Sequence, residues 1–308
     1  MIKLPSIKVE NLSKTYGSFK ALDSISFEYS GNRVVGYLGP NGAGKTTTLK
    51  IMTNLLRPDS GNVFINDINV NHDSVVALKK VGSLVENPSP FPYFTVEESL
   101  RFVGDLRKVP KDVTTSKIKE LSDLLRLPPL KSRIGHLSKG QRQRVVLAST
   151  LISDPEVLIL DEPTSGLDPF EMKIIRDLIK DLKNDHLVLM SSHLLSEVAE
   201  VCDDVIFIGK GKILAKENVA DISGKFQTSQ VEIEFLGADL PDVVKSLKNT
   251  GYNVTTANGS KIRIKFSGKD EERAKILADA MKLAPVISFV SVGSALEDAY
   301  ISILGGTA

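Results

Sequence analysis

Residues 39–46 have the sequence Gly-Pro-Asn-Gly-Ala-Gly-Lys-Thr, which fits the pattern G-x-x-x-x-G-K-[ST] and lies between a strand-like and a helix-like segment. Glycines allow backbone N–H groups to turn inward around phosphate oxygens, and the start of the following helix adds donors and a favourable dipole. We expect Lys45 to reach the β- and γ-phosphates of a nucleotide and the Thr46 hydroxyl to bind Mg²⁺. A plain glycine-rich turn is the alternative, and the complete motif in this setting argues against it.

The neighbourhood of this loop extends the nucleotide site. Residues 32–38 are expected to form the strand before the loop, and Lys45 to Leu56 the helix after it. We assign nucleotide contacts to the whole loop and to the residue that follows it: Gly39, Pro40, Asn41, Gly42, Ala43, Gly44, Lys45, Thr46 and Thr47.

A second motif is the apolar run Val157–Leu160, which ends in Asp161 and Glu162. Buried charge is costly without a partner, and a magnesium–nucleotide would supply that partner. Asp161 is placed to hold Mg²⁺ through its water shell. Glu162 is placed to polarise the attacking water as general base. A solvated acidic turn is the alternative, which the phosphate-loop motif makes the poorer explanation.

The apolar pattern predicts an α/β fold for the first part of the chain. Leu187–Ser192 and Val205–Ile208 are short continuous apolar runs, which are typical of parallel strands covered on both faces. A helical stretch at about residues 96–153 lies among the strands. We therefore predict a P-loop nucleotide-binding domain over residues 1–224 that includes this helical subdomain.

A second pattern begins where the composition turns polar, around residues 224–230. The expected elements are a strand at 231–235, a helix at 241–249, a hairpin of strands at 252–257 and 261–266, a helix at 270–283 and a strand at 286–292. This β-α-β-β-α-β order predicts an α+β ferredoxin-like domain at residues 230–308. Gly251 is expected to end the first helix, and Asn258-Gly259 to turn the hairpin. Ser294 and Glu297 would form the capping box of a closing helix.

Composition narrows the class of protein. The 308 residues are 42% hydrophobic and 25% charged, and the formal net charge is +1. Such values are ordinary for a globular protein and do not suggest a nucleic-acid binder. The single cysteine, Cys202, excludes an intramolecular disulfide and fits a reducing compartment. We expect neither a signal peptide nor a membrane span, since no run of 18 apolar residues occurs.

The stretch Leu137-Ser138-Lys139-Gly140-Gln141 resembles the signature loop of ABC transporter ATP-binding subunits, which usually has Gly in place of Lys139. Ser138 is expected to cap the next helix and to form a capping box with Gln141. The resemblance implies that this helix N-terminus faces the γ-phosphate held by another subunit. Ser138, Gly140 and Gln141 would then complete the nucleotide site in trans, and Lys139 would add a positive charge there.

Further motifs extend the resemblance over roughly residues 6–220. Residues 165–168, Ser-Gly-Leu-Asp, resemble the D-loop, which communicates across the dimer, and Asp168 is assigned to the nucleotide site. His193 resembles the switch histidine that contacts the γ-phosphate and the catalytic base, although a lone histidine is more often structural. Tyr16 resembles the aromatic residue that stacks on adenine. The resemblance implies an ATPase whose catalytic residues are Lys45, Glu86, Glu162 and His193.

Glu86 is a departure from the family pattern. Aligning residues 82–88 places it where the family usually has a Gln that contacts Mg²⁺ and the attacking water. A Glu here resembles the ABC-2-type exporters that give self-protection against peptide antibiotics and lantibiotics. Glu86 can accept from water or bind Mg²⁺, so we expect metal dependence to be kept and Glu86→Gln to retain ATPase activity.

The resemblance also implies partners. An integral-membrane permease would be one, with Phe91, Tyr93 and Phe94 as interface candidates; packing of this loop on its own domain is the alternative. A second ATP-binding subunit, identical or paralogous, would be the other. The chain would then lie peripherally on the cytoplasmic face of the cell membrane.

Local charge bears on these partners. Residues 101–144 carry twelve Lys/Arg and four Asp/Glu, which we interpret as solvated helix faces, with anionic lipid or an acidic partner as the alternative. Residues 230–308 carry nine Lys/Arg and ten Asp/Glu, which argues against RNA binding. No nucleic-acid partner is expected.

The predicted function is ATP hydrolysis that powers export through a separate permease. A soluble ABC ATPase acting on ribosomes or DNA is the alternative, but such relatives usually carry two nucleotide domains or coiled-coil inserts, which this sequence does not show. An importer ATPase is a third reading, against which two features argue: Glu86, and the C-terminal region ending in residues 294–300, which resembles the extension common on ATPases of ABC-2-type exporters. The cargo stays open, as does the choice between homodimer and heterodimer.

Overall fold

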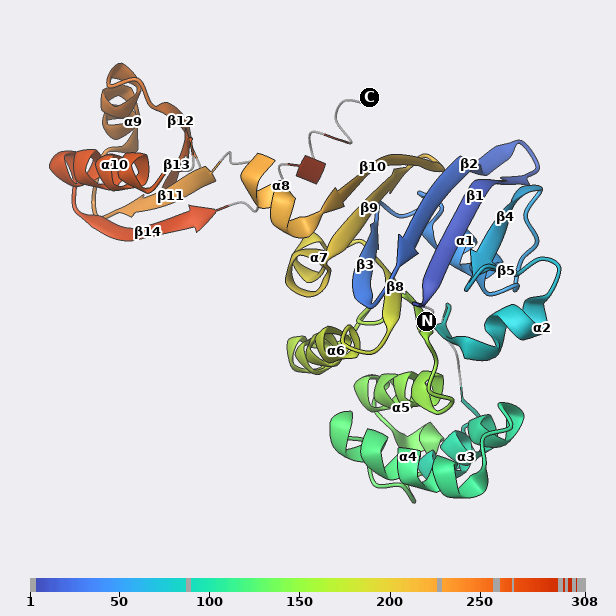
Figure 1. Cartoon of the computed structure of the whole chain (residues 1–308). Coiled ribbons are helices and arrows are strands. Elements are labelled where there is room, and N and C mark those ends of the chain that lie inside the picture. The colour runs from blue at the N-terminus through green and yellow to red at the C-terminus, as the bar shows by residue number, and fades with distance from the viewer. Residues whose placement is uncertain are drawn as a thin grey trace. The chain divides into compact units, whose positions relative to one another are not determined.

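The computed structural model describes residues 4–86, 90–225, 229–256, 261–267 and 269–292, together with positions 296, 299, 300 and 303. Contacts divide the chain into two compact units, Met1–Asn218 and Val219–Ala308. Figure 1 labels the elements of each unit. Within the described residues, no helix combines the length and the apolar character that crossing a bilayer requires.

A six-stranded sheet forms the centre of the first unit, in the order β10-β9-β3-β8-β7-β6. The strands are β3 (Arg33–Leu38), β6 (Val81–Leu84), β7 (Val157–Asp161), β8 (Leu187–Ser192), β9 (Asp204–Gly209) and β10 (Lys212–Asn218). All pairings are parallel except that of β10 with β9. Every residue of β7 and β8 is buried, which accounts for their continuous apolar sequences. The predicted P-loop α/β fold is confirmed.

A second, antiparallel sheet covers the core, in the order β2-β1-β4-β5. Its strands are β1 (Ser6–Tyr16), β2 (Phe19–Ser30), β4 (Ser60–Ile65) and β5 (Ile68–Asn69). One cluster of buried side chains joins this sheet to the parallel sheet, and the rings of Phe27 and Tyr37 lie 5.8 Å apart within it. The antiparallel sheet therefore packs against the parallel sheet and helps to hold it in place.

The helix after the glycine-rich loop is shorter than predicted. It is α1 (Lys45–Met52), whereas the sequence predicted a helix to Leu56. Asn54 adopts a left-handed φ of 57° and donates to the Ile51 carbonyl, and the N–H of Leu55 bonds back to the Lys50 carbonyl. This is a Schellman ending, which asparagine can supply as well as glycine.

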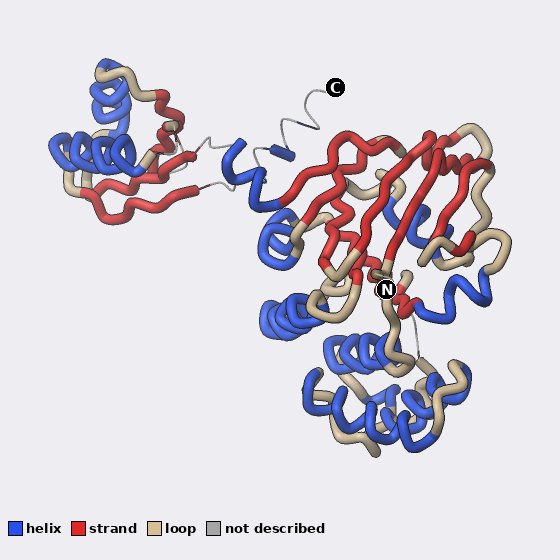
Figure 2. Tube along the Cα trace, in the orientation of Figure 1, coloured by secondary structure: helices blue, strands red, loops and turns tan. Residues whose placement is uncertain are grey.

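Three helices gather into the predicted helical subdomain: α3 (Val96–Leu106), α4 (Lys111–Leu124) and α5 (Lys139–Leu151). Figure 2 shows them as a helical group beside the strands. The shorter helices α2 (Ser74–Ala77) and η1 (Leu78–Lys80) precede β6 in the chain, and η2 (Ile134–His136) lies between α4 and α5. Several cations of the helical subdomain are already engaged, as in the ion pair of Arg101 with Glu97 and of Lys117 with Glu120.

The second unit starts with α8 (Val219–Lys225) and continues as a ferredoxin-like arrangement. Its elements are β11 (Ser229–Phe235), α9 (Leu240–Asn249), β12 (Asn253–Thr256), β13 (Lys261–Phe266), α10 (Asp270–Leu283) and β14 (Val286–Val292). The sheet order is β12-β13-β11-β14, with every pair antiparallel. Gly251 follows α9 with a left-handed φ of 92°, as predicted. The Asn258-Gly259 turn and the Ser294–Glu297 cap lie outside the described residues.

Candidate functional site

The glycine-rich loop follows β3 and leads into α1, and its glycines are required by space and by backbone conformation. Gly42 and Gly44 have left-handed φ angles of 80° and 107°. A Cβ on Gly39 would lie 2.3 Å from the Ile208 carbonyl oxygen, and one on Gly44 would lie 2.7 Å from that of Ala21. The loop can therefore follow this path only with glycine at these positions. The side chain of Ala43 is buried in the core beneath it.

Lys45 folds back over the loop. Its ammonium donates to the Gly39 carbonyl at 2.8 Å and to the Pro40 carbonyl at 3.2 Å. Burial lowers the pKa of Lys45, and the carboxylates of Glu162 and Asp161 oppose that shift. The ammonium is thus held at the loop by groups that an incoming phosphate can replace.

Asp161 is the last residue of β7 and Glu162 follows it, and both contact Ser191. Ser191, at the end of neighbouring β8, donates its hydroxyl to Asp161 Oδ1 at 2.5 Å and accepts from the Glu162 N–H at 2.9 Å. Glu162 has a left-handed φ of 44°, which is costly for a residue with a Cβ and is typical of functional sites. Ser191 could not be predicted as a site residue, because a serine within an apolar strand gives no motif.

His193 follows β8 and faces Glu162. Its Nδ1 lies 3.2 Å from Glu162 Oε2, while Lys45 Nζ lies 3.7 Å from Glu162 Oε1. The Glu162 carboxylate therefore stands between an ammonium and an imidazole. The predicted residues Lys45, Glu162 and His193 are brought together in one cluster.

A surface depression of about 190 Å³ opens over this cluster. Its lining is Tyr16, Phe19, Ala21, Asn41, Gly42, Gly44, Lys45, Thr46, Thr47 and Glu162. Tyr16 and Phe19 pair across the β1–β2 hairpin, and both are exposed. Phe19 is not among the predicted site residues, although an aromatic residue next to a hairpin turn is a signal that could have identified it.

The signature-like segment forms the expected cap. Ser138 Oγ accepts from the Gln141 N–H at 3.1 Å, and Gln141 Oε1 accepts from the Ser138 N–H at 3.0 Å, so the predicted capping box of α5 is confirmed. Asp168 caps α6 (Pro169–Leu182) by accepting from two backbone N–H groups at 3.0 Å. Within one chain, neither Ser138 nor Asp168 lines the depression at the glycine-rich loop.

The two capped helices pack against each other at their first turns. A Cβ on Gly140 would lie 2.6 Å from the Glu171 side chain, and Glu171 pairs with Arg144 at 3.1 Å. The Lys139 ammonium lies directly over Gly166. The start of α5 and the loop before α6 therefore present a single surface.

Glu86 does not line the depression at the glycine-rich loop. It has a left-handed φ of 62° and forms an ion pair with Lys50 of α1, and its side chain is exposed. Lys50 was not predicted as a partner of Glu86.

The loop before α3 presents aromatic side chains. Phe91, Phe94 and Phe102 pack together with ring centroids 5.2 to 5.7 Å apart, and Tyr93 is 83% exposed. Phe102 belongs to this cluster although the sequence analysis did not include it. Phe91 is also exposed, so the loop is only partly packed on its own unit.

Comparison with known proteins identifies the family. The family model described as ABC transporter matches residues 22–165. The uncharacterized ABC transporter ATP-binding protein YhcH of Bacillus subtilis is 32% identical over 98% of this chain and 96% of its own length. The chain belongs to the ABC transporter ATP-binding proteins. This membership makes it an ATP-binding subunit and an ATPase, as predicted.

Other ABC relatives differ in the transport that their names describe. The bacitracin transport ATP-binding protein BcrA of Bacillus licheniformis is 36% identical over 68% of each chain. The probable sulfate/thiosulfate import ATP-binding protein CysA of Chlorella vulgaris is 33% identical over 75% of this chain and 99% of its own. Membership of the ABC family therefore leaves the direction of transport open.

Solved ABC structures share the fold. The ATP-binding subunit of an ABC transporter superposes with a TM-score of 0.66 at 27% identity, covering 79% of this chain and 99% of that one. A dimeric ATP-binding cassette in a post-hydrolysis state with ADP and Pi gives a TM-score of 0.62 at 25% identity, covering 69% of this chain and 98% of that one. ABC cassettes of this fold thus form dimers.

The residues present fit Mg²⁺ that arrives with the nucleotide. Among the described residues, no three His, Cys, Asp or Glu side chains cluster into a metal site of their own. Magnesium at phosphate sites is commonly held by one or two carboxylates and the phosphates themselves. Asp161 is a buried carboxylate, and Thr46 lines the depression, so both residues carry hard oxygen donors of the kind required.

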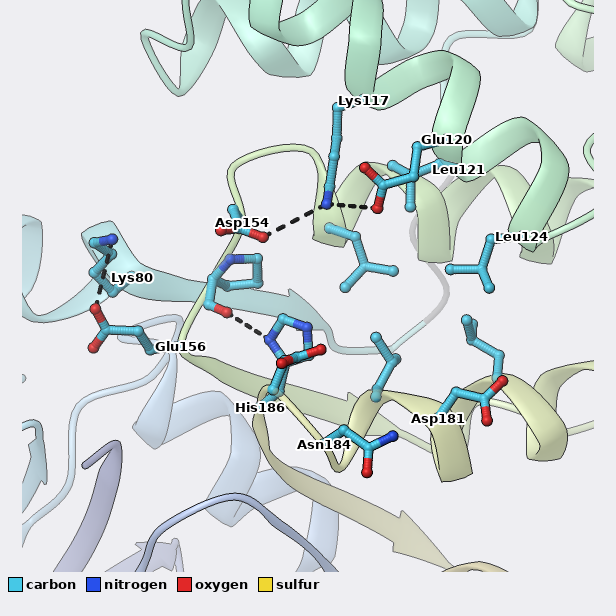
Figure 3. A pocket seen from close by; sticks show the side chains of 15 residues that line it. Lys80, Lys117, Glu120, Leu121, Leu124, Asp154, Glu156, Asp181, Asn184 and His186 are labelled. Atoms are coloured by element: carbon cyan, nitrogen blue, oxygen red, sulfur yellow. Dashed lines mark hydrogen bonds and ion pairs between the residues drawn. The ribbon is translucent and has the colours of Figure 1, made fainter. Parts of the chain in front are cut away.

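A larger cavity of about 670 Å³ lies elsewhere (Figure 3). It is lined by α4, by the loop before β7 and by the turn before β8, where His186 Nδ1 contacts the Pro155 carbonyl oxygen at 2.7 Å. The segments before β7 and β8 lie at the amino ends of these parallel strands, whereas the predicted nucleotide-binding residues follow the carboxyl ends of the strands. None of the predicted site residues lines this cavity.

Proposed function

We propose that this chain is the ATP-hydrolysing subunit of an ABC-2-type exporter, bound peripherally to a membrane permease at the cytoplasmic face of the cell membrane. The position of the Glu162 carboxylate between Lys45 and His193, beside the glycine-rich loop, carries the hydrolytic part of this proposal. Glu86 and the similarity to a bacitracin transport protein favour export.

Binding of ATP starts at the loop and at Tyr16. Tyr16 offers an exposed ring face to adenine, and the loop offers backbone N–H groups to the phosphates. The Lys45 ammonium exchanges the carbonyls of Gly39 and Pro40 for phosphate oxygens. Asn41, Thr46 and Thr47 complete the lining around the phosphates.

Hydrolysis is assigned to the Glu162 cluster. Glu162 accepts a proton from the attacking water, and His193 orients the water and the γ-phosphate. Ser191 fixes the Glu162 backbone and one oxygen of Asp161. Asp161, Thr46 and Glu86 are the residues that would hold Mg²⁺, which supplies neutralisation of phosphate charge when bound.

A second ATP-binding subunit completes each site. Ser138 and Lys139 lie exposed at the capped start of α5, where backbone N–H groups and the helix dipole favour an anion. Ser138, Gly140, Gln141 and Asp168 are assigned to the nucleotide held by the opposite loop. ATP would then join two subunits head to tail, and hydrolysis would release them.

The permease is assigned to the aromatic loop before α3. Phe91 and Tyr93 are exposed aromatic side chains next to the helical subdomain, and the ring of Phe94 packs against that of Phe91. Such a patch is typical of a protein interface.

The test is a pull-down of tagged full-length chain from detergent-solubilised native membranes, followed by mass spectrometry. A stoichiometric polytopic partner is expected, and it should be lost in a Phe91→Ser/Tyr93→Ser variant. Val75→Ser, at an equally exposed position on α2, is the matched control and should retain the partner. Recovery from the soluble fraction with ribosomal or DNA-bound proteins would overturn the transport proposal, and a partner that takes substrate inward would overturn export alone.

A further inference from the structure

Glu197 is a buried carboxylate that the proposed mechanism does not use. It lies on α7 (Leu195–Val201), directly after the His193 loop, and its side chain is 1% exposed. Thr164 Oγ1 donates to Glu197 Oε1 at 2.6 Å, and Ser192 Oγ donates to Glu197 Oε2 at 2.6 Å. Each oxygen therefore receives one short hydroxyl hydrogen bond.

Burial of the Glu197 carboxylate carries a cost in the free energy of folding. Across the part of the chain that the structure describes, no lysine, arginine or histidine forms an ion pair with Glu197. Burial of a carboxylate without a cation is unfavourable, and two hydroxyl donors compensate only in part. A glutamine, or an apolar side chain facing apolar neighbours, would fill the same space at lower cost. What the carboxylate adds is acceptor capacity on both oxygens, which lets it bind two hydroxyls at once.

The two hydroxyls belong to the two segments that meet at the catalytic cluster. Thr164 comes two residues after Glu162, in the turn that leads to Gly166 and Asp168. Ser192 directly precedes His193, and its hydroxyl also accepts from the Leu194 N–H at 2.9 Å. Glu197 thus links the segment that carries the base to the segment that carries the histidine.

The His193 side chain depends on this link for its position. The side chain is 42% exposed, and within the described residues its ring contacts Glu162 Oε2. The backbone on both sides is fixed through Ser192, by Glu197 on one side and by Leu194 on the other. A shift of Ser192 would therefore move the imidazole relative to Glu162.

We propose that Glu197 is a positioning residue for ATP hydrolysis: it joins Thr164 to Ser192 and so sets the distance between Glu162 and His193. This inference rests on the roles proposed for Glu162 and His193. It predicts that Glu197 affects the hydrolytic step and not the binding of ATP, since no atom of Glu197 lines the nucleotide depression.

The experiment compares Glu197→Gln with wild type in the purified full-length chain. Glutamine keeps the shape but can accept from only one of the two hydroxyls. Misplacement of a catalytic group by about 1 Å can cost on the order of a hundredfold in rate, so kcat should fall by about ten- to a hundredfold. ATP affinity, measured by equilibrium binding, should change less than about twofold. The matched control is Glu200→Gln, on the same helix but paired with Arg176 and Lys180 at the surface, which should keep its wild-type kcat.

A double-mutant cycle separates positioning from general stability. If Glu197 acts through His193, Glu197→Gln should slow wild type but have little further effect in the His193→Ala background. Equal slowing in both backgrounds would overturn the proposal, as would unchanged kcat in Glu197→Gln. Should Glu197→Gln fail to fold, Thr164→Val and Ser192→Ala each remove one arm of the link, and both must lower kcat. If His193→Ala itself hydrolyses ATP normally, the role proposed for His193 fails, and that outcome is distinct from failure of the Glu197 link.

Discussion

Nδ1 of His193 lies 3.2 Å from Oε2 of Glu162, because β7 and β8 are parallel neighbours that end at the same edge of the sheet. The contact joins residues that lie 31 positions apart in the sequence, with α6 and β8 between them. The other oxygen of the same carboxylate, Oε1, faces Lys45, so Glu162 connects His193 to Lys45.

The first prediction concerns this carboxylate. Glu162→Gln keeps the shape of the side chain and removes the base, so hydrolysis should slow by about 10²- to 10⁴-fold. ATP binding should persist, and the variant should accumulate as an ATP-bound dimer. Phosphate release and size-exclusion chromatography with ATP measure the two effects. Glu28→Gln, on the exposed face of β2, is the control; wild-type turnover in Glu162→Gln would contradict the assignment of the base.

A second prediction concerns Ser191. Ser191→Ala removes the hydrogen bond to Asp161 Oδ1 and leaves the Glu162 N–H without its acceptor. Because both groups are at the end of a buried strand, the free energy of unfolding should fall by about 1–3 kcal/mol, and hydrolysis should slow as well. Ser149→Ala is the matched control, since Ser149 bonds only within its own helix. Denaturant unfolding of both variants makes the comparison, and equal stability would show that the Ser191 bonds contribute nothing.

The local motifs could be predicted from the sequence because each is complete within a few residues. The glycine-rich loop, the Ser138–Gln141 capping box and the Asp161–Glu162 strand end are examples, and all three were found. The parallel order of the strands then brings separate motifs to one edge. Ser191, Glu197 and Lys50 were missed for the opposite reason: each acts through a partner distant in the sequence, and a single serine, glutamate or lysine carries no pattern.

The end of α1 shows a different limit. Apolar periodicity continued to Leu56, yet the helix ends at Met52 because Asn54 turns left-handed and closes a Schellman motif. Asparagine gives this signal less often than glycine, so the pattern of apolar residues outweighed it. The ion pair of Glu86 with Lys50 could not be predicted either, because a surface ion pair follows no periodicity in the sequence.

A third prediction concerns pH. Burial lowers the pKa of the Lys45 ammonium from its usual 10.5, although Glu162 and Asp161 oppose the shift. A neutral amine attracts phosphate poorly, so ATP affinity should decline as pH rises toward that lowered pKa, which lies below the usual 10.5 of a lysine. Lys45→Met should bind weakly and without this decline. Equilibrium titrations at several pH values test the difference, and parallel profiles for the two proteins would contradict it.

The last prediction addresses Glu86, which replaces the glutamine usual in the family. Its ion pair with Lys50 neutralises the negative charge that Glu86 adds. Glu86→Gln should therefore retain both ATPase activity and metal dependence, because a glutamine accepts from water as well. Lys50→Gln should be worse, since it leaves the Glu86 charge uncompensated near the phosphates, and ATP affinity should fall. The double variant Glu86→Gln/Lys50→Gln should recover that affinity.

Because Glu86 is 58% exposed, the pair of Glu86 and Lys50 should couple by less than about 1 kcal/mol in the free energy of unfolding. Lys117→Gln, which breaks an ion pair with Glu120 on α4, controls for loss of a surface cation. A Glu86→Gln protein that neither binds nor hydrolyses ATP would place the water-contacting residue of this family elsewhere in the chain, whereas equal losses in Lys50→Gln and the double variant would show that Lys50 acts on the nucleotide directly and not through Glu86.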